Sequence, residues 1–194
     1  YRTPGYPLFL SVFYILAGKN MVLFYFLITL IQILMDGLVI FFLYRLTFWA
    51  TDSISIANLA ALLFSFYPFA IVWTVVIHTE TLSLFTFVLT FYLFFHPSLK
   101  WRFFLAGISG SYCMLCRINL GLIIPILVLA ILFLEWNQMK TVLFRRVGFF
   151  VLGVSLIYLP WPLRNYFNHD KLIFTQDFSS DYSDDFRAFR SYIL

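Results

Sequence analysis

A single carboxylate, Glu80, interrupts the long apolar stretch that occupies residues 53–134 of this chain. Glu80 stands between the apolar runs 54–77 and 82–95. A carboxylate at such a place lies either at a membrane surface or inside the membrane, and the second position is costly. Two readings follow. Either Thr79 caps a helix whose positive end faces Glu80, or Glu80 belongs to a functional site.

The low charge content of the chain excludes a soluble domain. Of its 194 residues, 62% are hydrophobic and 11% are charged, and the mean hydropathy is +0.91. Soluble domains carry about 25% charged residues. Several apolar runs approach the ~20 residues that span a bilayer as a helix. The sequence therefore predicts an all-α fold, a polytopic transmembrane helical bundle. The net charge of +4 comes from basic residues scattered in short loops, so we expect no nucleic-acid partner.

We expect about six membrane spans and one short interfacial helix. The interfacial helix covers residues 8–16, with Pro7 near its first turn and Gly18 near its end. Pro68 should kink the second span, and Pro160 should stop the last one. The six spans are residues 21–44, 54–77, 81–95, 103–115, 121–134 and 147–159.

The chain divides into two parts of unequal size. Residues 1–167 form the transmembrane domain, and residues 168–194 form a polar, acidic tail on the non-cytoplasmic side. The chain begins with Tyr1 rather than methionine. We therefore expect an internal fragment of a longer protein.

Polar side chains inside the apolar runs allow more than one interpretation. Gln32 and Asp36 share one helix face and either bond to each other, which would fix helix packing, or line a polar cavity. Cys113 and Cys116 have the spacing of a redox or metal motif, but in so apolar a stretch we expect packing residues. Arg45 should end the first span.

Alternation of six spans distributes the loops between two faces. Arg117 lies between two short apolar runs, where it either reaches toward headgroup phosphates or binds a phosphate-bearing ligand. Residues 1–7, Glu80, Arg117, Arg164 and the acidic tail then share one face. The other face is cytoplasmic by the positive-inside rule, because it holds Arg45, Lys100, Arg102, Lys140, Arg145 and Arg146.

Four short motifs follow one another along the chain. They are Arg2-Thr3-Pro4-Gly5-Tyr6-Pro7-Leu8-Phe9-Leu10, Thr79-Glu80, Arg117, and Pro160-Trp161 with Leu163-Arg164-Asn165-Tyr166. Together they resemble the polytopic glycosyltransferases of the GT-C type that use polyprenyl-phosphate sugars. This family includes the dolichyl-phosphate-mannose–protein mannosyltransferases and the bacterial aminoarabinose transferases. Thr81 and Ile118 stand where many relatives have proline, and the family's usual catalytic Asp would precede Tyr1.

The resemblance implies an enzyme that moves a sugar from a polyprenyl-phosphate donor to a protein, lipid or glycan acceptor on the non-cytoplasmic face. Glu80 is the catalytic candidate, which would position the acceptor, assist the base or hold a metal ion. A divalent metal ion would serve the same phosphate chemistry, and no set of metal ligands is assigned. The candidates for holding the lipid phosphate and substrate are Arg2, Tyr6, His78, Arg117 and Arg164.

The implied location is a bacterial or archaeal cell membrane in preference to the endoplasmic reticulum, with membrane lipid around the spans. The alternative is a non-enzymatic polytopic membrane protein, either a transporter or a packing subunit. Asp36 with Gln32 is the feature that best fits transport. A polymerase or ligase of lipid-linked glycans would share the outer-face site.

Overall fold

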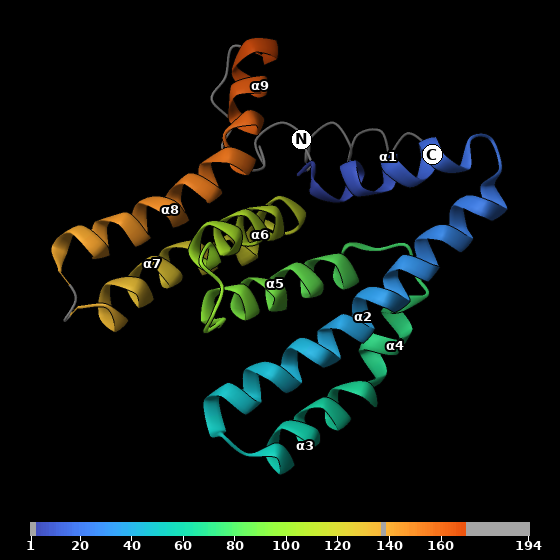
Figure 1. The fold of residues 1–194 in the computed structure, drawn as a ribbon. Helices are drawn as coiled ribbons and strands as arrows, with labels where there is room; N and C mark the ends of the chain where they lie inside the picture. Colours follow the sequence, from blue (N-terminus) through green and yellow to red (C-terminus); the bar gives the residue numbers. More distant parts are fainter. Residues whose placement is uncertain (1–2, 137–138, 170–194) are drawn as a thin grey trace, which may run out of the picture.

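The fold consists of helices joined by short turns (Figure 1). It is described by a computed structural model, which covers residues 3–136 and 139–169. Within these ranges no strand occurs, so the predicted all-α class is confirmed. The helices are α1 (Gly5–Ala17), α2 (Met21–Thr51), α3 (Ile54–Ser65), α4 (Pro68–Thr74), α5 (Thr79–Phe95), α6 (Arg102–Cys116), the 3-10 helix η1 (Ile118–Leu122), α7 (Ile123–Leu134), α8 (Lys140–Tyr158) and α9 (Pro160–His169).

Fewer helices than predicted are long enough to cross a membrane. Two described stretches qualify by length and composition, Met21–Thr51 and Lys140–Phe167, and the bent pair α3 and α4 would make a third. A helix needs about 20 residues to cross the hydrocarbon core, whereas α5, α6 and α7 have 17, 15 and 12. Six spans are therefore not supported. Two to three candidate spans indicate a membrane protein whose remaining apolar helices are short.

The first long helix extends further than predicted. α2 continues past Arg45 to Thr51, so the prediction that Arg45 ends it is wrong. The helix ends where Asp52 adopts a left-handed φ of 51° and donates its backbone N–H to the carbonyl of Phe48 at 2.8 Å. Ser53 follows and caps α3, because its hydroxyl accepts the N–H of Ile56 at 3.4 Å. Arg45 itself stacks its guanidinium over the indole of Trp49.

The predicted stop at Pro160 is observed in part, because α8 ends at Tyr158 but a further helix, α9, begins at Pro160. Pro160 is the first residue of α9, a position whose N–H has no intrahelical partner in any helix. The backbone N–H of Leu163 reaches the carbonyl of Leu159 at 3.2 Å. α8 and α9 therefore run on as one apolar stretch, and α9 continues to His169. The predicted acidic tail lies, from residue 170 on, outside the described residues.

Two other proline and glycine predictions are confirmed. α3 and α4 meet at a bend of 53°, where Tyr67 is extended because the following Pro68 disfavours a helical residue before it. α1 ends at Gly18, which has a φ of 59°, a conformation that glycine adopts at little cost. α1 begins earlier than predicted, at Gly5, because Pro4 and Pro7 both fit its start.

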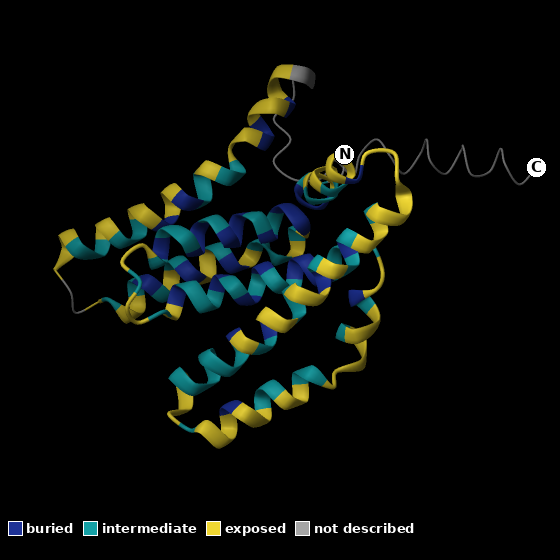
Figure 2. Ribbon diagram, turned by 45° about the vertical axis from the view of Figure 1, so that its right-hand side comes forward, coloured by how far each residue is buried: buried dark blue, intermediate teal, exposed yellow. Residues whose placement is uncertain are grey.

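The core of the molecule lies where α5, α6, α7 and α8 pack together, as the dark blue residues in Figure 2 show. α6 and α8 approach closely because each supplies a glycine. A Cβ on Gly107 would collide with the backbone carbonyl of Phe150, and one on Gly153 with that of Phe104. Small residues that let backbones approach are typical of helix contacts in membranes. The buried side chains of this core are Phe94, Phe103, Ala106, Ile123, Leu127, Ile131 and Phe150.

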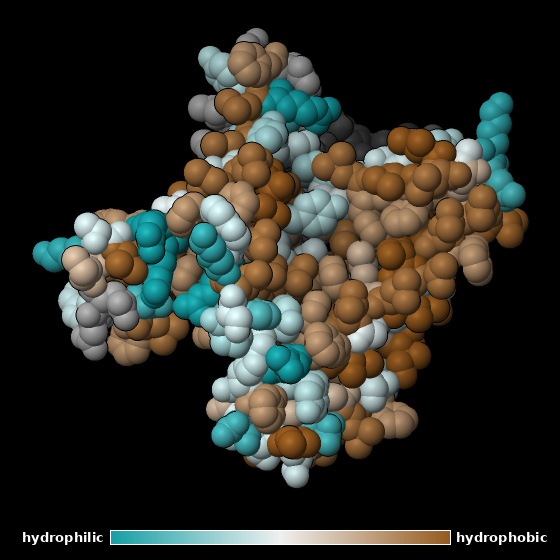
Figure 3. All heavy atoms as spheres, in the orientation of Figure 1, coloured by the Kyte–Doolittle hydropathy of each residue, from teal (hydrophilic) through white to brown (hydrophobic). Residues whose placement is uncertain are grey.

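The bundle has two ends of different chemistry. α1 lies across one end, where Gly5 packs on the backbone of Leu115 and accepts a hydrogen bond from the Tyr112 hydroxyl at 2.9 Å. The opposite end carries the turn before α6 and the turn before α8, and hydrophilic side chains gather there in Figure 3. α6 connects the two ends, since its 15 residues extend about 22 Å from Arg102 to Cys116.

Candidate functional site

The turn between α4 and α5 presents Glu80 at the start of a helix. His78 is extended (φ −145°, ψ 164°), and α5 begins at Thr79. No side chain caps this helix start, so the predicted Thr79 cap is wrong. The Thr79 hydroxyl lies instead 3.3 Å from Oε2 of Glu80. Glu80 occupies the first turn, where the unpaired N–H groups of a helix favour a negative charge.

Arg117 reaches Glu80 from the end of α6. The helix stops at Cys116, and Arg117 is extended (φ −143°, ψ 112°), with its N–H bonded to the carbonyl of Cys113 at 2.9 Å. This conformation aims the side chain at the start of α5, and Nη1 of Arg117 lies 2.7 Å from Oε1 of Glu80. Residues 37 positions apart thus form one ion pair.

The second carboxylate oxygen of Glu80 is engaged by His78. Nδ1 of His78 contacts Oε2 of Glu80, and the imidazole ring lies 5.1 Å from the ring of Trp73. The three side chains are not equally covered, because Glu80 is 24% exposed, whereas Arg117 and His78 are 43% and 50% exposed. The carboxylate is therefore held between two basic groups that solvent or a ligand can reach.

A pocket of about 510 Å³ opens beside this ion pair. Its wall is mostly aromatic and aliphatic, whereas the polar groups lie on α2, at the start of α5 and after α6. A largely apolar pocket with a few convergent polar groups is the usual form of a small-molecule site. The lining residues are Asp36, Tyr67, Phe69, Ala70, Trp73, Glu80, Thr81, Ser83, Leu84, Phe87, Arg117, Asn119 and Leu120.

Asp36 and Gln32 do not bond to each other, so the predicted pair that would fix helix packing is wrong. Both reach across to the segment that leads into α5. The Thr74 hydroxyl contacts Oδ2 of Asp36, and Nε2 of Gln32 donates to the carbonyl of Val76 at 3.4 Å. Asp36 lines the same pocket as Glu80. The other reading of Asp36, that it lines a polar cavity, therefore matches its position.

Tyr6 lies behind the pocket rather than in it. Its ring packs in a buried cluster with Leu82 and Cys116, and its hydroxyl has no hydrogen-bond partner among the described residues. Burial is the main reason that the pKa of Tyr6 is raised to about 12. Tyr6 supports the start of α5 through Leu82, and it does not line the Glu80 pocket.

Arg164 belongs to a different cavity. It lines a cavity of about 390 Å³ between α1 and the α8–α9 junction, together with Pro7 and Trp161. Its guanidinium lies 5.5 Å from the centre of the Trp161 ring. Arg2 lies outside the described residues. Of the six site residues proposed from sequence, the structure thus brings together His78, Glu80 and Arg117.

The described residues offer no complete metal site. No group of three His, Cys, Asp or Glu side chains within residues 3–136 and 139–169 lies close enough to share an ion. His78 and Glu80 make up two ligands at most. Cys113 and Cys116 are both buried and unbridged, and the Cys113 thiol contacts the carbonyl of Ser83 at 3.5 Å. They pack as predicted.

Several pocket residues could not be identified from the sequence. Trp73 and Asn119 line the pocket, but their residue types and spacing carry no signal that would separate them from ordinary interface residues. Thr81 hydrogen-bonds through its hydroxyl to the carbonyl of Trp73 at 3.2 Å, which fixes α4 against α5. Only the folded chain brings these positions together.

Comparisons with family models, curated proteins and solved structures gave no match for this chain.

Proposed function

We propose that this chain belongs to a membrane glycosyltransferase that moves a sugar from a polyprenyl-phosphate donor to an acceptor on the non-cytoplasmic side. The observation that carries the proposal is the Glu80–Arg117 ion pair at a largely apolar pocket. A lipid-phosphate sugar needs an apolar wall, a cation for the phosphate and a carboxylate for the acceptor's proton. The Glu80 pocket offers all three.

The pairing of Arg117 with Glu80 suggests how donor binding would prepare the site. A donor phosphate that enters the pocket competes with Glu80 for the guanidinium of Arg117, whose planar fork suits phosphate oxygens. Glu80 is then free to accept a hydrogen bond from the acceptor hydroxyl. The negative charge of the phosphate replaces that of the carboxylate beside Arg117.

The chemical step balances with these groups. The acceptor oxygen attacks the anomeric carbon of the sugar and forms a new bond to it, while the bond from that carbon to the phosphate oxygen breaks. The acceptor's proton passes to Glu80, and polyprenyl phosphate leaves with the electron pair of the broken bond. Arg117 stabilises the charge that grows on the leaving phosphate.

The charges at the two ends support a site on the non-cytoplasmic side of the membrane. Lys100, Arg102, Arg145 and Arg146 lie at the end opposite Glu80, and basic residues are retained on the cytoplasmic side. Glu80 and Arg117 then face the periplasm, the exterior or a lumen. We place the protein in a bacterial or archaeal cell membrane by the same resemblance that suggests the activity.

Sugar transfer by the whole protein that contains this chain, reconstituted in liposomes, tests this function. The donors are polyprenyl phosphates that carry a radiolabelled hexose or pentose, and the readouts are release of polyprenyl phosphate and transfer of label to a membrane extract. We expect Glu80→Gln and Arg117→Ala each to lower transfer by roughly 10²–10⁴-fold. Lys19→Gln is the charge-matched control, since Lys19 is exposed and lies in the turn between α1 and α2.

Transfer that both variants retain at the wild-type rate would overturn the assignment of this site. Correct folding of each variant is checked by its elution as a single species in detergent and by its helical circular dichroism. Arg117→Lys sharpens the result. A lysine keeps the charge but loses the planar fork, so partial rescue indicates that the phosphate is held mainly by charge.

A transporter is the second candidate, and the observation that favours it is the position of Asp36. An ionisable residue within a spanning helix that lines a cavity is typical of substrate or proton pathways. Asp36→Asn separates the two functions. Loss of solute uptake in liposomes, with no sugar transfer by the wild type, would favour transport.

A further inference from the structure

Another pocket, which is more polar and has a volume of about 460 Å³, lies at the end of the bundle opposite Glu80. Two segments far apart in sequence form it, the turn from Pro97 into α6 and the first half of α8. We refer to it as the basic pocket. Its lining residues are Pro97, Ser98, Leu99, Lys100, Trp101, Arg102, Phe103, Phe104, Arg145, Arg146 and Phe149.

The cations of the basic pocket are only partly neutralised. Arg102 and Arg146 both contact Glu135, the former through Nη2 at 3.4 Å from Oε1 and the latter at Oε2. Lys100 and Arg145 are exposed, and no described residue forms an ion pair with either of them. The four cations of the pocket thus have one carboxylate beside them. The pocket therefore carries excess positive charge, which a bound anion would neutralise.

Apolar surface adjoins these cations. Trp101 is 51% exposed, and its ring meets that of Phe149 edge-on at 5.4 Å. Tryptophan at the end of an apolar helix is typical of the headgroup level of a bilayer. Phe144 and Phe149 on α8 are also exposed. A ligand seated here touches cations at one part and hydrocarbon-facing surface at another, which fits a lipid better than a free anion.

We propose that the basic pocket binds the phosphate headgroup of an anionic phospholipid from the surrounding bilayer. Lys100 and Arg145 contact the phosphate directly, while Glu135 holds Arg102 and Arg146 in place behind them. Trp101 and Phe149 lie against the upper acyl chains. Basic pockets between membrane helices are known to suit such headgroups. This site is independent of sugar transfer, because it lies at the other end of α6 from Arg117.

Retention of lipid by the purified full chain tests the proposal. The protein is equilibrated in detergent with phosphatidylglycerol or phosphatidylcholine, and native mass spectrometry counts the bound lipids. We expect the wild type to retain phosphatidylglycerol in preference to phosphatidylcholine. Lys100→Gln with Arg145→Gln should weaken phosphatidylglycerol binding by about thirtyfold, the effect of two basic residues at a membrane surface. Both residues are exposed, so the change leaves the core intact.

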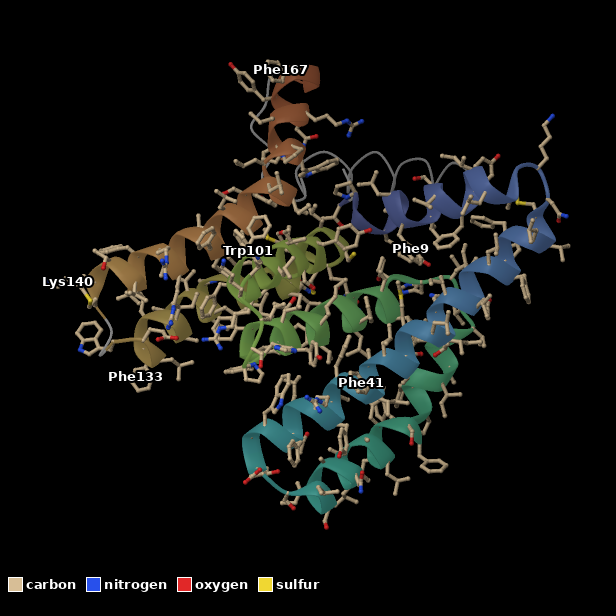
Figure 4. The ribbon with its side chains drawn as sticks, in the orientation of Figure 1. Phe9, Phe41, Trp101, Phe133, Lys140 and Phe167 are labelled. Carbon is tan, nitrogen blue, oxygen red and sulfur yellow. The ribbon has the colours of Figure 1, made fainter. Side chains whose placement is uncertain are left out.

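The matched control removes the same charge outside the basic pocket. Lys140 lies at the start of α8, at the outer end of that helix in Figure 4, and does not line the pocket. Lys19 lies in the turn after α1. Lys19→Gln with Lys140→Gln should change phosphatidylglycerol binding by less than about twofold. An equal loss in this control would overturn the proposal, because charge alone rather than the pocket would then explain binding.

Competition with free phosphate distinguishes a lipid headgroup from a free anion as the ligand of the basic pocket. Inorganic phosphate at millimolar concentration should not displace phosphatidylglycerol if the acyl chains contribute to binding. Displacement by inorganic phosphate, or equal retention of phosphatidylcholine and phosphatidylglycerol by the wild type, would each contradict a lipid-headgroup site.

Discussion

The two ends of the bundle contain the same small arrangement, one carboxylate between two basic side chains. At one end Glu80 contacts His78 and Arg117, and at the other Glu135 contacts Arg102 and Arg146. Exposure separates them, since Glu80 is 24% exposed and Glu135 is 12% exposed. An ion pair alone therefore does not indicate a reactive site.

What surrounds each carboxylate differs more than the ion pairs themselves. Glu80 borders a largely apolar pocket that also receives Asp36 from another helix, so a ligand can reach the carboxylate. Glu135 lies behind its arginines, and the cations rather than the carboxylate face the basic pocket. We therefore interpret Glu80 as a reacting group and Glu135 as a positioning group.

The largest expected effect comes from the close contact between α6 and α8, the helices on which both ends depend. Gly107→Ala places a methyl group against the backbone carbonyl of Phe150, which cannot move without separating α6 from α8. We expect a loss of at least about 3 kcal/mol of stability, with both ends disrupted. Gly148→Ala on α8 is the control, because nothing lies within 4 Å of its added Cβ. Thermal unfolding in detergent should show no loss for Gly148→Ala, and an equally mild Gly107→Ala would contradict the close packing.

The second prediction concerns phosphate binding at the Glu80 end. Arg117→Ala should weaken binding of a short polyprenyl phosphate by about tenfold to a hundredfold, the range expected for charge-assisted hydrogen bonds. Lys100→Gln at the basic pocket should leave that affinity unchanged. Titration calorimetry with farnesyl phosphate in detergent measures both. Equal losses of affinity in both variants would contradict a phosphate site at the Glu80 end alone.

The third prediction concerns stability, for which we expect the larger loss at the Glu135 end rather than at the Glu80 end. Glu135→Gln leaves Arg102 and Arg146 side by side without a countercharge in a partly buried place, so we expect a loss of about 1–3 kcal/mol. Glu80→Gln should cost less than about 1 kcal/mol, because its partners are exposed and water replaces them. Denaturant unfolding of both variants tests the order. A greater loss for Glu80→Gln would mean that Glu80 is mainly structural.

The smallest expected effect is at Tyr6, behind the Glu80 end. Tyr6→Phe removes a buried hydroxyl that has no partner among the described residues, so stability at pH 7 should change by less than about 0.5 kcal/mol. The raised pKa of Tyr6, about 12, means that the folded chain keeps the phenol proton to higher pH than the unfolded chain. The wild type should therefore lose stability as the pH rises from 10 to 12, and Tyr6→Phe should lose less.

Features set by local chemistry could be predicted from the sequence. Gly18 ends α1 and Pro68 bends the segment between α3 and α4, because both residues act on the backbone beside them. That Glu80 and Arg117 lie at the same end of the bundle was also predicted, because each stands at the end of an apolar run and on the same expected face of the membrane. Their roles in catalysis remain predictions.

Features that depend on distant partners could not be predicted. Asp36 lies one helical turn from Gln32, yet it contacts Thr74, and no spacing in the sequence indicates that choice. In the sequence nothing distinguishes Glu135 from an ordinary acidic loop residue, and only the folded chain brings it to Arg102 and Arg146. Six spans are not supported because three of the predicted spans form helices of only 17, 15 and 12 residues, and apolar composition does not show whether so short a helix crosses the bilayer.

The most direct test of the account compares the two carboxylates in one assay. Glu80→Gln and Glu135→Gln make the same chemical change at opposite ends of the bundle, and sugar transfer from polyprenyl-phosphate donors is measured at equal amounts of the folded whole protein that contains this chain. We predict that Glu80→Gln lowers transfer by roughly 10²–10⁴-fold, whereas Glu135→Gln retains it within about threefold, since it acts only through stability. Transfer that survives Glu80→Gln, or that falls equally in both variants, would contradict the claim that the Glu80 end is the reactive one.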